Sequence, residues 1–389
     1  MFDALRQFLR GALAAAARPV SRSRSKAGIA LLPYRGYGSR DELFLIGRVF
    51  RQRPGARQDK GLSLSGQVRN VMRRITRHPV QDMGVTARFG DASLRTRTDA
   101  DGYFRIRMAL PSPPPDTTCW HDVTLTLDGA PVTAKAPVFI PPPDCRFVVI
   151  SDIDDTVVET GVANTVLMLW RLFVADAKSR TAFPGVAALY RGLHRGRSDA
   201  EFNPLLYVSR APWGTYEVLD AFFRLHGIPV GPVLFLREWG VRWTSPIPRK
   251  ARTHKEDLIR HMLALYGTLP FVLIGDSGQQ DPEIYARIVA DHPGRVLTVM
   301  IRDVSGDPAR TRAIADLSEA VAKAGASLLL AADSVAMARH ALSLGLVPAE
   351  VVEATAADRR HEAPAEDDAP GASVVIDAGE RGPARIQGR

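Results

Sequence analysis

The residues of this chain best suited to chemistry form the segment Asp152-Ile153-Asp154-Asp155-Thr156, directly after an apolar run at 147–150. A short run rich in β-branched residues is typical of a buried strand, and open α/β sheets place ligands at the carboxyl ends of their strands. Asp152 and Asp154 are two positions apart, so the pleat of the strand would aim both carboxylates the same way. Such a pair repels unless a cation lies between the two groups, and carboxylate oxygens suit Mg²⁺. The spacing predicts metal-assisted phosphoryl transfer with an aspartyl nucleophile. Taken alone, the segment is equally typical of a turn or a helix cap.

Further polar residues follow two other predicted strands. The run at 205–208 ends in Ser209 and Arg210, and the run at 271–274 ends in Gly275-Asp276, with Asp281 shortly after it. Lys255 lies between these runs, where the sequence predicts the start of a helix over 255–266. Together the three strand ends and the lysine supply a nucleophile, an acid/base, phosphate donors, a cation and metal ligands, which is the set that phosphoryl transfer requires.

In this order the motifs resemble those of the haloacid dehalogenase superfamily of phosphatases. The first motif is matched by Asp152-x-Asp154-x-Thr156, the second by Ser209, the third by Lys255, and the fourth by Gly275-Asp276 with Asp281. Within that superfamily, residues 145–305 are similar to the catalytic domain of the actin-patch type phosphatidate phosphatases. This similarity rests also on Pro212-Trp213, His254-Lys255 and Asp281-Pro282-Glu283, and more weakly on Tyr34-Arg35-Gly36-Tyr37-Gly38. Arg210 departs from the family pattern, which has a small polar residue after the serine.

The resemblance implies a role for each matching residue. Asp152 would be the nucleophile and Asp154 the general acid and base, while Ser209 and Lys255 would donate to the phosphate oxygens. Thr156 would support the loop that follows Asp152 and contribute to substrate binding. Arg210 does not follow from the resemblance: its charge beside the site could bind substrate phosphate, or it could form an ordinary surface or inter-domain ion pair. The implied cofactor is Mg²⁺, held by Asp152, the backbone carbonyl of Asp154, Asp276 and Asp281. The implied activity is hydrolysis of phosphatidate to diacylglycerol through an aspartyl phosphate. Two alternatives stay open: a phosphomonoesterase acting on a soluble or protein phosphate, and a non-catalytic module that binds anionic lipid.

The elements around these motifs predict two domains. Apolar runs alternate with helix-like segments from Cys145 onward, which indicates an α/β fold, a Rossmann-like parallel sheet of the haloacid dehalogenase type over 145–347. Short strand candidates separated by turn signals precede it and predict a smaller β-sandwich domain over 30–140. These candidates lie at 42–49, 85–89, 104–107 and 123–127. Residues 348–389 are rich in Ala, Pro and charge, and we expect a disordered tail.

The composition of the chain indicates which classes of partner it could bind. The net charge of +9 favours anionic partners, and no recognisable nucleic-acid motif accompanies the basic residues. Two cysteines do not make a disulfide framework, and no apolar stretch reaches the roughly 20 residues that span a bilayer. Residues 1–29 are basic and amphipathic, which is typical either of a helix on an anionic membrane surface or of a packing helix or disordered arm. We therefore expect a cytoplasmic protein that can attach peripherally to an anionic membrane surface; the sequence specifies no protein partner.

Overall fold

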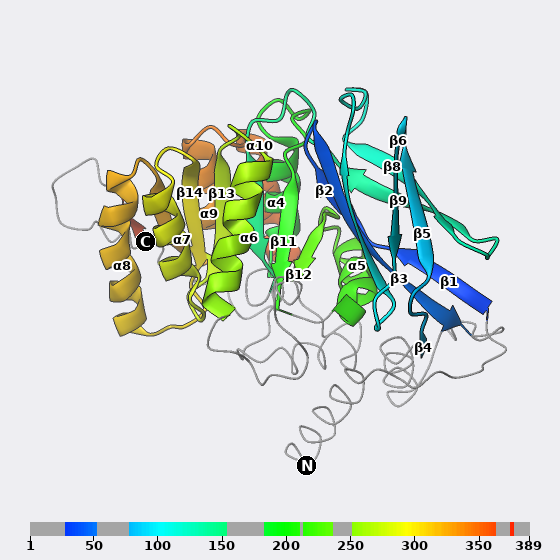
Figure 1. The fold of residues 1–389 in the computed structure, drawn as a ribbon. Coiled ribbons are helices and arrows are strands. Elements are labelled where there is room, and N and C mark those ends of the chain that lie inside the picture. The colour runs from blue at the N-terminus through cyan, green and yellow to red at the C-terminus, as the bar shows by residue number, and fades with distance from the viewer. Residues whose placement is uncertain are drawn as a thin grey trace, which may run out of the picture.

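The computed structural model describes residues 28–52, 78–153, 183–210, 213–235, 251–362 and 374–376. In this part of the chain a mixed β-sheet near the N-terminus is followed by a largely parallel sheet with helices packed on it (Figure 1). Two of the predicted site residues, Asp154 and Thr156, lie outside the described residues, as does the predicted N-terminal segment up to residue 27.

The first sheet has nine strands. They are β1 (Gly28–Pro33), β2 (Gly36–Gly38), β3 (Glu42–Gln52), β4 (His78–Pro79), β5 (Gly84–Phe89), β6 (Ala92–Arg97), β7 (Tyr103–Ala109), β8 (Trp120–Leu127) and β9 (Thr133–Phe139). Their order is β1-β3-β2-β9-β8-β5-β6, with β4 and β7 also paired to β3. Alternation in β7 buries Phe104, Ile106 and Met108 and exposes Arg105 and Arg107, as expected of a strand with one face on a core. All four predicted strands are present; their arrangement as a sandwich stays a prediction.

The second sheet has seven strands. They are β10 (Val148–Asp152), β11 (Leu205–Ser209), β12 (Val233–Phe235), β13 (Phe271–Asp276), β14 (Val296–Arg302), β15 (Ser327–Ala331) and β16 (Val374–Ile376). Their order is β12-β11-β10-β13-β14-β15-β16, and every pairing is parallel except that of β15 with β16. The chain proceeds outward in one direction from β10 to β12 and in the other from β13 to β15. A parallel sheet with this reversal binds ligands in the crevice where the reversal occurs, here between β10 and β13.

Helices cover both faces of the parallel sheet, which confirms the predicted α/β class. They are α4 (Val186–Arg195), the short 3₁₀ helix η2 (Trp213–Thr215), α5 (Tyr216–Leu225), α6 (Ala251–Leu265), α7 (Asp281–Asp291), α8 (Pro308–Lys323), α9 (Ser334–Ser343) and α10 (Ala349–Glu362). Apolar residues of α6, α7 and α8 share one buried cluster with the sheet, and those of α4, α5 and α9 share another. The helix predicted to begin at Lys255 begins about one turn earlier, at Ala251. Among the described residues, no helix combines the length and apolar character that crossing a bilayer requires.

The prediction that residues 348–389 form a disordered tail is wrong for residues 349–362, which form α10. This helix packs against α4 and α9, where Thr355 is fully buried and Val351 and Val352 contact the core. Ion pairs from Arg191 to Asp358 (2.9 Å) and from Arg359 to Asp333 (2.7 Å) add to the contact. The buried stripe of α10 is narrow and contains alanine and threonine, so the sequence shows little hydrophobic periodicity there.

The two sheets meet at the segment Tyr34-Arg35-Gly36-Tyr37-Gly38. The Tyr34 ring stacks on Trp213, with ring centroids 5.2 Å apart and planes within 5°. The backbone amide of Arg35 donates to the Tyr216 hydroxyl (2.9 Å), and its guanidinium pairs with Asp220. These contacts hold η2 and α5, which follow the predicted site residue Ser209 in the chain.

Candidate active site

Three neighbouring parallel strands end in a polar residue at the same edge of the sheet. Asp152 ends β10, Ser209 ends β11 and Asp276 ends β13, and all three side chains are buried. Strand β10 pairs with both β11 and β13 in parallel, with Asp152 opposite Val208 and Ser151 opposite Ile274, so the three ends lie together. This edge lies at the reversal of strand order, which is where an α/β sheet offers a ligand crevice.

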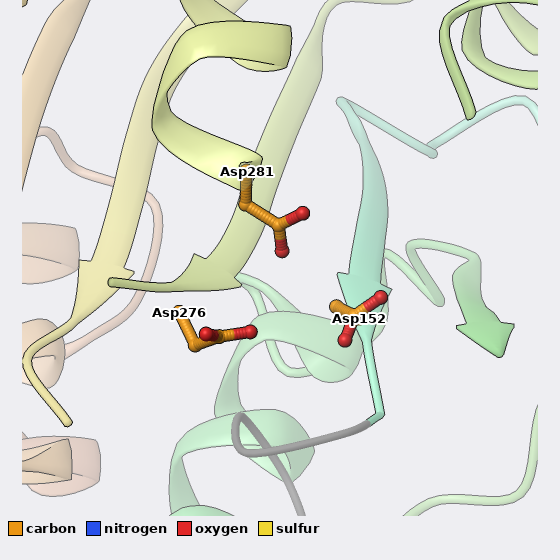
Figure 2. A group of neighbouring side chains, drawn as sticks. All are labelled: Asp152, Asp276 and Asp281. Atoms are coloured by element: carbon orange, nitrogen blue, oxygen red, sulfur yellow. The ribbon is translucent and has the colours of Figure 1, made fainter. Parts of the chain in front are cut away.

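A third carboxylate reaches this edge from the start of α7. Asp281 is the first residue of that helix, and Pro282 suits the first turn because an amide donor is not needed there. The Asp281 side chain packs directly over Gly275: a Cβ built at position 275 would lie 2.7 Å from the Asp281 Cβ. Figure 2 shows Asp152, Asp276 and Asp281 pointing into one shared space. One oxygen from each of the three carboxylates lies within 4.8 Å of the others.

Lys255 supplies a buried positive charge between two of these acids. Its Nζ atom lies 2.8 Å from Oδ1 of Asp152 and 2.5 Å from Oδ1 of Asp281. Lys255 shares a helix face with Ile259 and Met262, which are buried against the sheet, and it is itself buried. The ammonium also lies 5.3 Å from the centroid of the Tyr285 ring. Burial alone would lower the pKa of Lys255, but the two carboxylates raise it well above its usual value, so the side chain stays charged.

The charges at this edge favour a bound cation. Oδ2 of Asp152 and Oδ2 of Asp281 are buried without a hydrogen-bond partner among the described residues. Burial raises the pKa of the Asp281 carboxyl; Lys255 opposes this shift, Asp152 adds to it and Arg210 opposes it. The ammonium of Lys255 thus contacts two of the three clustered carboxylates, and the buried Oδ2 atoms of Asp152 and Asp281 favour a further positive group nearby. An all-oxygen donor set of this kind fits Mg²⁺, which is commonly held by one or two carboxylates and completed by water and phosphate.

Replacing Gly275 by alanine tests whether the position of Asp281 matters. The added Cβ would meet both the Cβ and the carboxylate of Asp281, so the Asp281 side chain would have to leave its present position. We expect Gly275→Ala to raise the Kd for Mg²⁺ by about ten- to a hundredfold, as misplaced groups around a metal commonly do. Titration calorimetry measures this constant. Gly28→Ala is the matched control, because an added Cβ there has nothing within 4 Å; equal constants for the two variants would contradict the packing argument.

The structure places four of the predicted site residues in one cluster: Asp152, Lys255, Asp276 and Asp281. Ser209 ends the neighbouring strand, and the charge of the next residue, Arg210, acts on both Lys255 and Asp281. That Ser209 and Arg210 contact substrate stays a prediction.

Several supporting residues were not given a role by sequence reasoning. Gln279 donates from Nε2 to Oδ2 of Asp276 (2.9 Å), and the Tyr285 hydroxyl donates to the carbonyl of Ile274 (3.1 Å). Beneath Asp152, the hydroxyls of Ser151 and Tyr190 lie 2.7 Å apart in a buried hydrogen bond. A weak signal exists for Tyr285, which is one helical turn from Asp281 and therefore shares its face. Tyr190 is distant in the sequence and carries no such signal.

Comparisons with known proteins match the segment of the chain that carries most of this site. Residues 147–303 match the family described as "Phosphatidate phosphatase APP1, catalytic domain". Phosphatidate phosphatase APP1 of Saccharomyces cerevisiae is 32% identical over 154 residues, which cover 39% of this chain and 25% of that protein. An uncharacterized protein of Schizosaccharomyces pombe is 31% identical over 159 residues, covering 41% of this chain and 25% of its own length. The resemblance predicted from the motifs is thereby confirmed, although the match spans only about a quarter of these relatives.

Among solved structures, a carbohydrate acetylesterase from Xanthomonas citri overlaps 73% of this chain and 72% of its own, at 12% identity and a TM-score of 0.26. A sialyltransferase from Photobacterium damsela overlaps 77% of this chain and 52% of its own, at 9% identity and a TM-score of 0.20. These scores carry no argument about fold or function.

Proposed function

We propose that this protein is a Mg²⁺-dependent phosphatidate phosphatase that works through an aspartyl phosphate on Asp152. The observation that carries the proposal is the buried cluster of Asp152, Asp276, Asp281 and Lys255 at the reversal of strand order, within the segment that matches the phosphatase family. A haloacid dehalogenase-like domain is the fold that would present these residues, with the nucleophile at the end of its first parallel strand, β10.

In the proposed reaction, a carboxylate oxygen of Asp152 attacks phosphorus, and the bond from phosphorus to the ester oxygen breaks. Lys255 holds the other oxygen of Asp152, which orients the nucleophile, and its positive charge stabilises the phosphate oxygens as charge develops. Asp154 protonates the departing alkoxide and then takes a proton from the water that hydrolyses the aspartyl phosphate. Asp152, Asp276 and Asp281 would hold Mg²⁺. When bound, the ion neutralises phosphate charge, so that an anionic nucleophile can approach.

Loss of Asp276 tests the cofactor. Asp276→Asn removes one anionic ligand while keeping the size of the side chain, so we expect the Mg²⁺ concentration for half-maximal activity to rise by about tenfold or more. Wild-type activity should vanish in excess chelator and return when Mg²⁺ is added back. The measurement is phosphate release across a Mg²⁺ titration, and full activity in chelator would exclude a metal mechanism.

The substrate is proposed from the family match, because the cluster recognises phosphate and not the leaving group. Purified full chain is given phosphatidate in vesicles, lysophosphatidate or a soluble phosphate monoester, and released phosphate is measured with kcat/KM for each. We expect phosphatidate to be preferred. A preference for the soluble ester would instead support a phosphomonoesterase acting on soluble or protein phosphate. No phosphate release from any substrate would leave the non-catalytic lipid-binding module.

We further propose that the protein reaches phosphatidate by peripheral attachment to an anionic membrane. Basic side chains near such a surface contribute about 1 kcal/mol each, and salt screens this attraction. Raising salt in the same assay should therefore lower activity on vesicles more than activity on the soluble ester. An equal salt response with both substrates would contradict electrostatic attachment.

A further inference from the structure

The segment between Asp276 and Asp281 must keep a fixed shape if both carboxylates are to meet one cation. It runs from the end of β13 to the start of α7 and carries Asp276 at one end and Asp281 at the other. Part of its shape comes from its own neighbours. The amide of Ser277 donates to the carbonyl of Arg302 (2.9 Å), and the Ser277 hydroxyl donates to Asp303 (3.0 Å). These two contacts use the amide and the hydroxyl of Ser277. They do not involve the backbone carbonyls of Ser277 and Gln279, which accept hydrogen bonds from another helix.

Arg310, in the first turn of α8, holds both of those carbonyls. Its Nε donates to the carbonyl of Ser277 (2.8 Å), and one terminal nitrogen donates to the carbonyl of Gln279 (2.6 Å). The guanidinium also makes a bidentate ion pair with the carboxylate of Glu283 in α7; the contact to Oε2 of Glu283 is 3.0 Å long. One side chain of α8 therefore joins the segment between the two acids to the helix that Asp281 begins. A planar guanidinium can make these contacts at once, whereas the single ammonium of a lysine cannot reproduce the arrangement.

The contacts of Arg310 lead to the metal-site carboxylates by two short paths. Gln279, whose carbonyl it holds, donates from its side chain to Oδ2 of Asp276 (2.9 Å). Glu283, its ion-pair partner, lies in the first turn of α7, which begins at Asp281. The side chains of Arg310 and Glu283 are 21% and 31% exposed, so water partly screens the pair and the directed hydrogen bonds matter more than its charge.

We infer that Arg310 is a positioning residue for the metal site: it sets the separation of Asp276 and Asp281, and thereby the affinity for Mg²⁺, without touching metal or substrate. This inference rests on the proposed function. Arg310 lies beyond residues 147–303, the segment matched by the phosphatase family, so that match assigns it no role. Groups that orient metal ligands commonly change metal affinity by about ten- to a hundredfold when removed.

The test compares Arg310→Gln with Arg312→Gln in the full chain. Arg312 is exposed on the same helix, and its Nε donates only to the helix carbonyl of Pro308 among the hydrogen bonds described, so it is the matched control. Titration calorimetry with MgCl₂ alone gives the Kd without any turnover. We expect Arg310→Gln to raise this Kd about tenfold, Arg312→Gln to leave it within about twofold, and Arg310→Lys to behave like Arg310→Gln.

Two further readouts separate positioning from a general structural role. Saturating Mg²⁺ should restore the kcat of Arg310→Gln to near the wild-type value, whereas a damaged fold would stay slow at every Mg²⁺ concentration. If Arg310→Gln does not fold, Glu283→Gln is used, because it removes the ion pair and leaves the carbonyl contacts in place; we then expect a smaller rise in Kd, of about threefold.

The outcomes are distinct. A Kd for Arg310→Gln equal to that of wild type, or a kcat that saturating Mg²⁺ does not restore, would overturn the role of Arg310 and leave the proposed function intact. An unchanged Kd for Glu283→Gln, where that variant is used, would do the same. Absence of Mg²⁺ binding by the wild-type protein would overturn the proposed metal site, and this inference with it.

Discussion

Asp152→Asn is expected to lower turnover by about 10⁴-fold or more, because the amide cannot act as the nucleophile that forms the aspartyl phosphate. Asp152 lies at the end of β10, is buried, and has one oxygen held by Lys255. The measurement is phosphate release from phosphatidate at saturating Mg²⁺ for wild type and variant. Activity within tenfold of wild type would show that another group attacks phosphorus.

The stability of the same variant separates a catalytic defect from a folding defect. The substitution removes one negative charge from a buried group of three carboxylates with one lysine among them. In chelator, where no cation offsets their repulsion, we expect the Tm of Asp152→Asn to equal or exceed that of wild type. A Tm several degrees below wild type in chelator would instead identify Asp152 as a residue that the fold needs for stability.

Lys255→Met should both abolish activity and destabilise the metal-free protein. Removing one partner of a buried ion pair leaves the other charge uncompensated, which costs about 3–5 kcal/mol. Here the methionine would leave Asp152 and Asp281 facing each other without a cation between them. For a domain of this size the loss corresponds to a fall in Tm of roughly 10 °C in chelator. Thermal unfolding followed by circular dichroism measures it.

Mg²⁺ and a surface lysine provide the controls for Lys255→Met. Because the ion would supply positive charge to the same carboxylates, adding Mg²⁺ should recover part of the lost Tm while activity stays low. Lys323→Met should change neither quantity, since the side chains of Lys323 and its partner Glu319 are both about three-quarters exposed. A Tm for Lys255→Met equal to that of wild type in chelator would contradict the uncompensated-charge argument.

Much of the parallel sheet and its helices was predictable because the buried strands are continuous apolar runs with polar ends. The runs at 147–150, 205–208 and 271–274 became β10, β11 and β13. Short or weakly patterned elements were missed. Strand β12 has three residues, and α10 packs its narrow stripe against α4 and α9. Such elements depend on what packs against them, and that information is not local.

The sequence by itself determined which residues could do the chemistry. Carboxylates directly after buried strands must lie at the carboxyl edge of a parallel sheet, because neighbouring parallel strands end on the same side. This local rule was sufficient to place Asp152 and Asp276 at one edge of the sheet, with Asp281 shortly after that edge and Lys255 as a nearby cation. The assignment of the three acids to a metal and of Lys255 to phosphate binding followed from the resemblance.

Only the tertiary structure decided how these residues are held. The order of strands puts β13 beside β10, although 118 residues (153–270) separate the end of β10 from the start of β13. No spacing in the chain reveals that adjacency. Other contacts also join segments that are distant in the sequence. They are the stacking of Tyr34 on Trp213 and the hydrogen bonds from Arg310 to two backbone carbonyls. The close packing of Asp281 over Gly275 likewise depends on how α7 is placed. They are packing relations, and packing is decided by the whole core and not by local sequence.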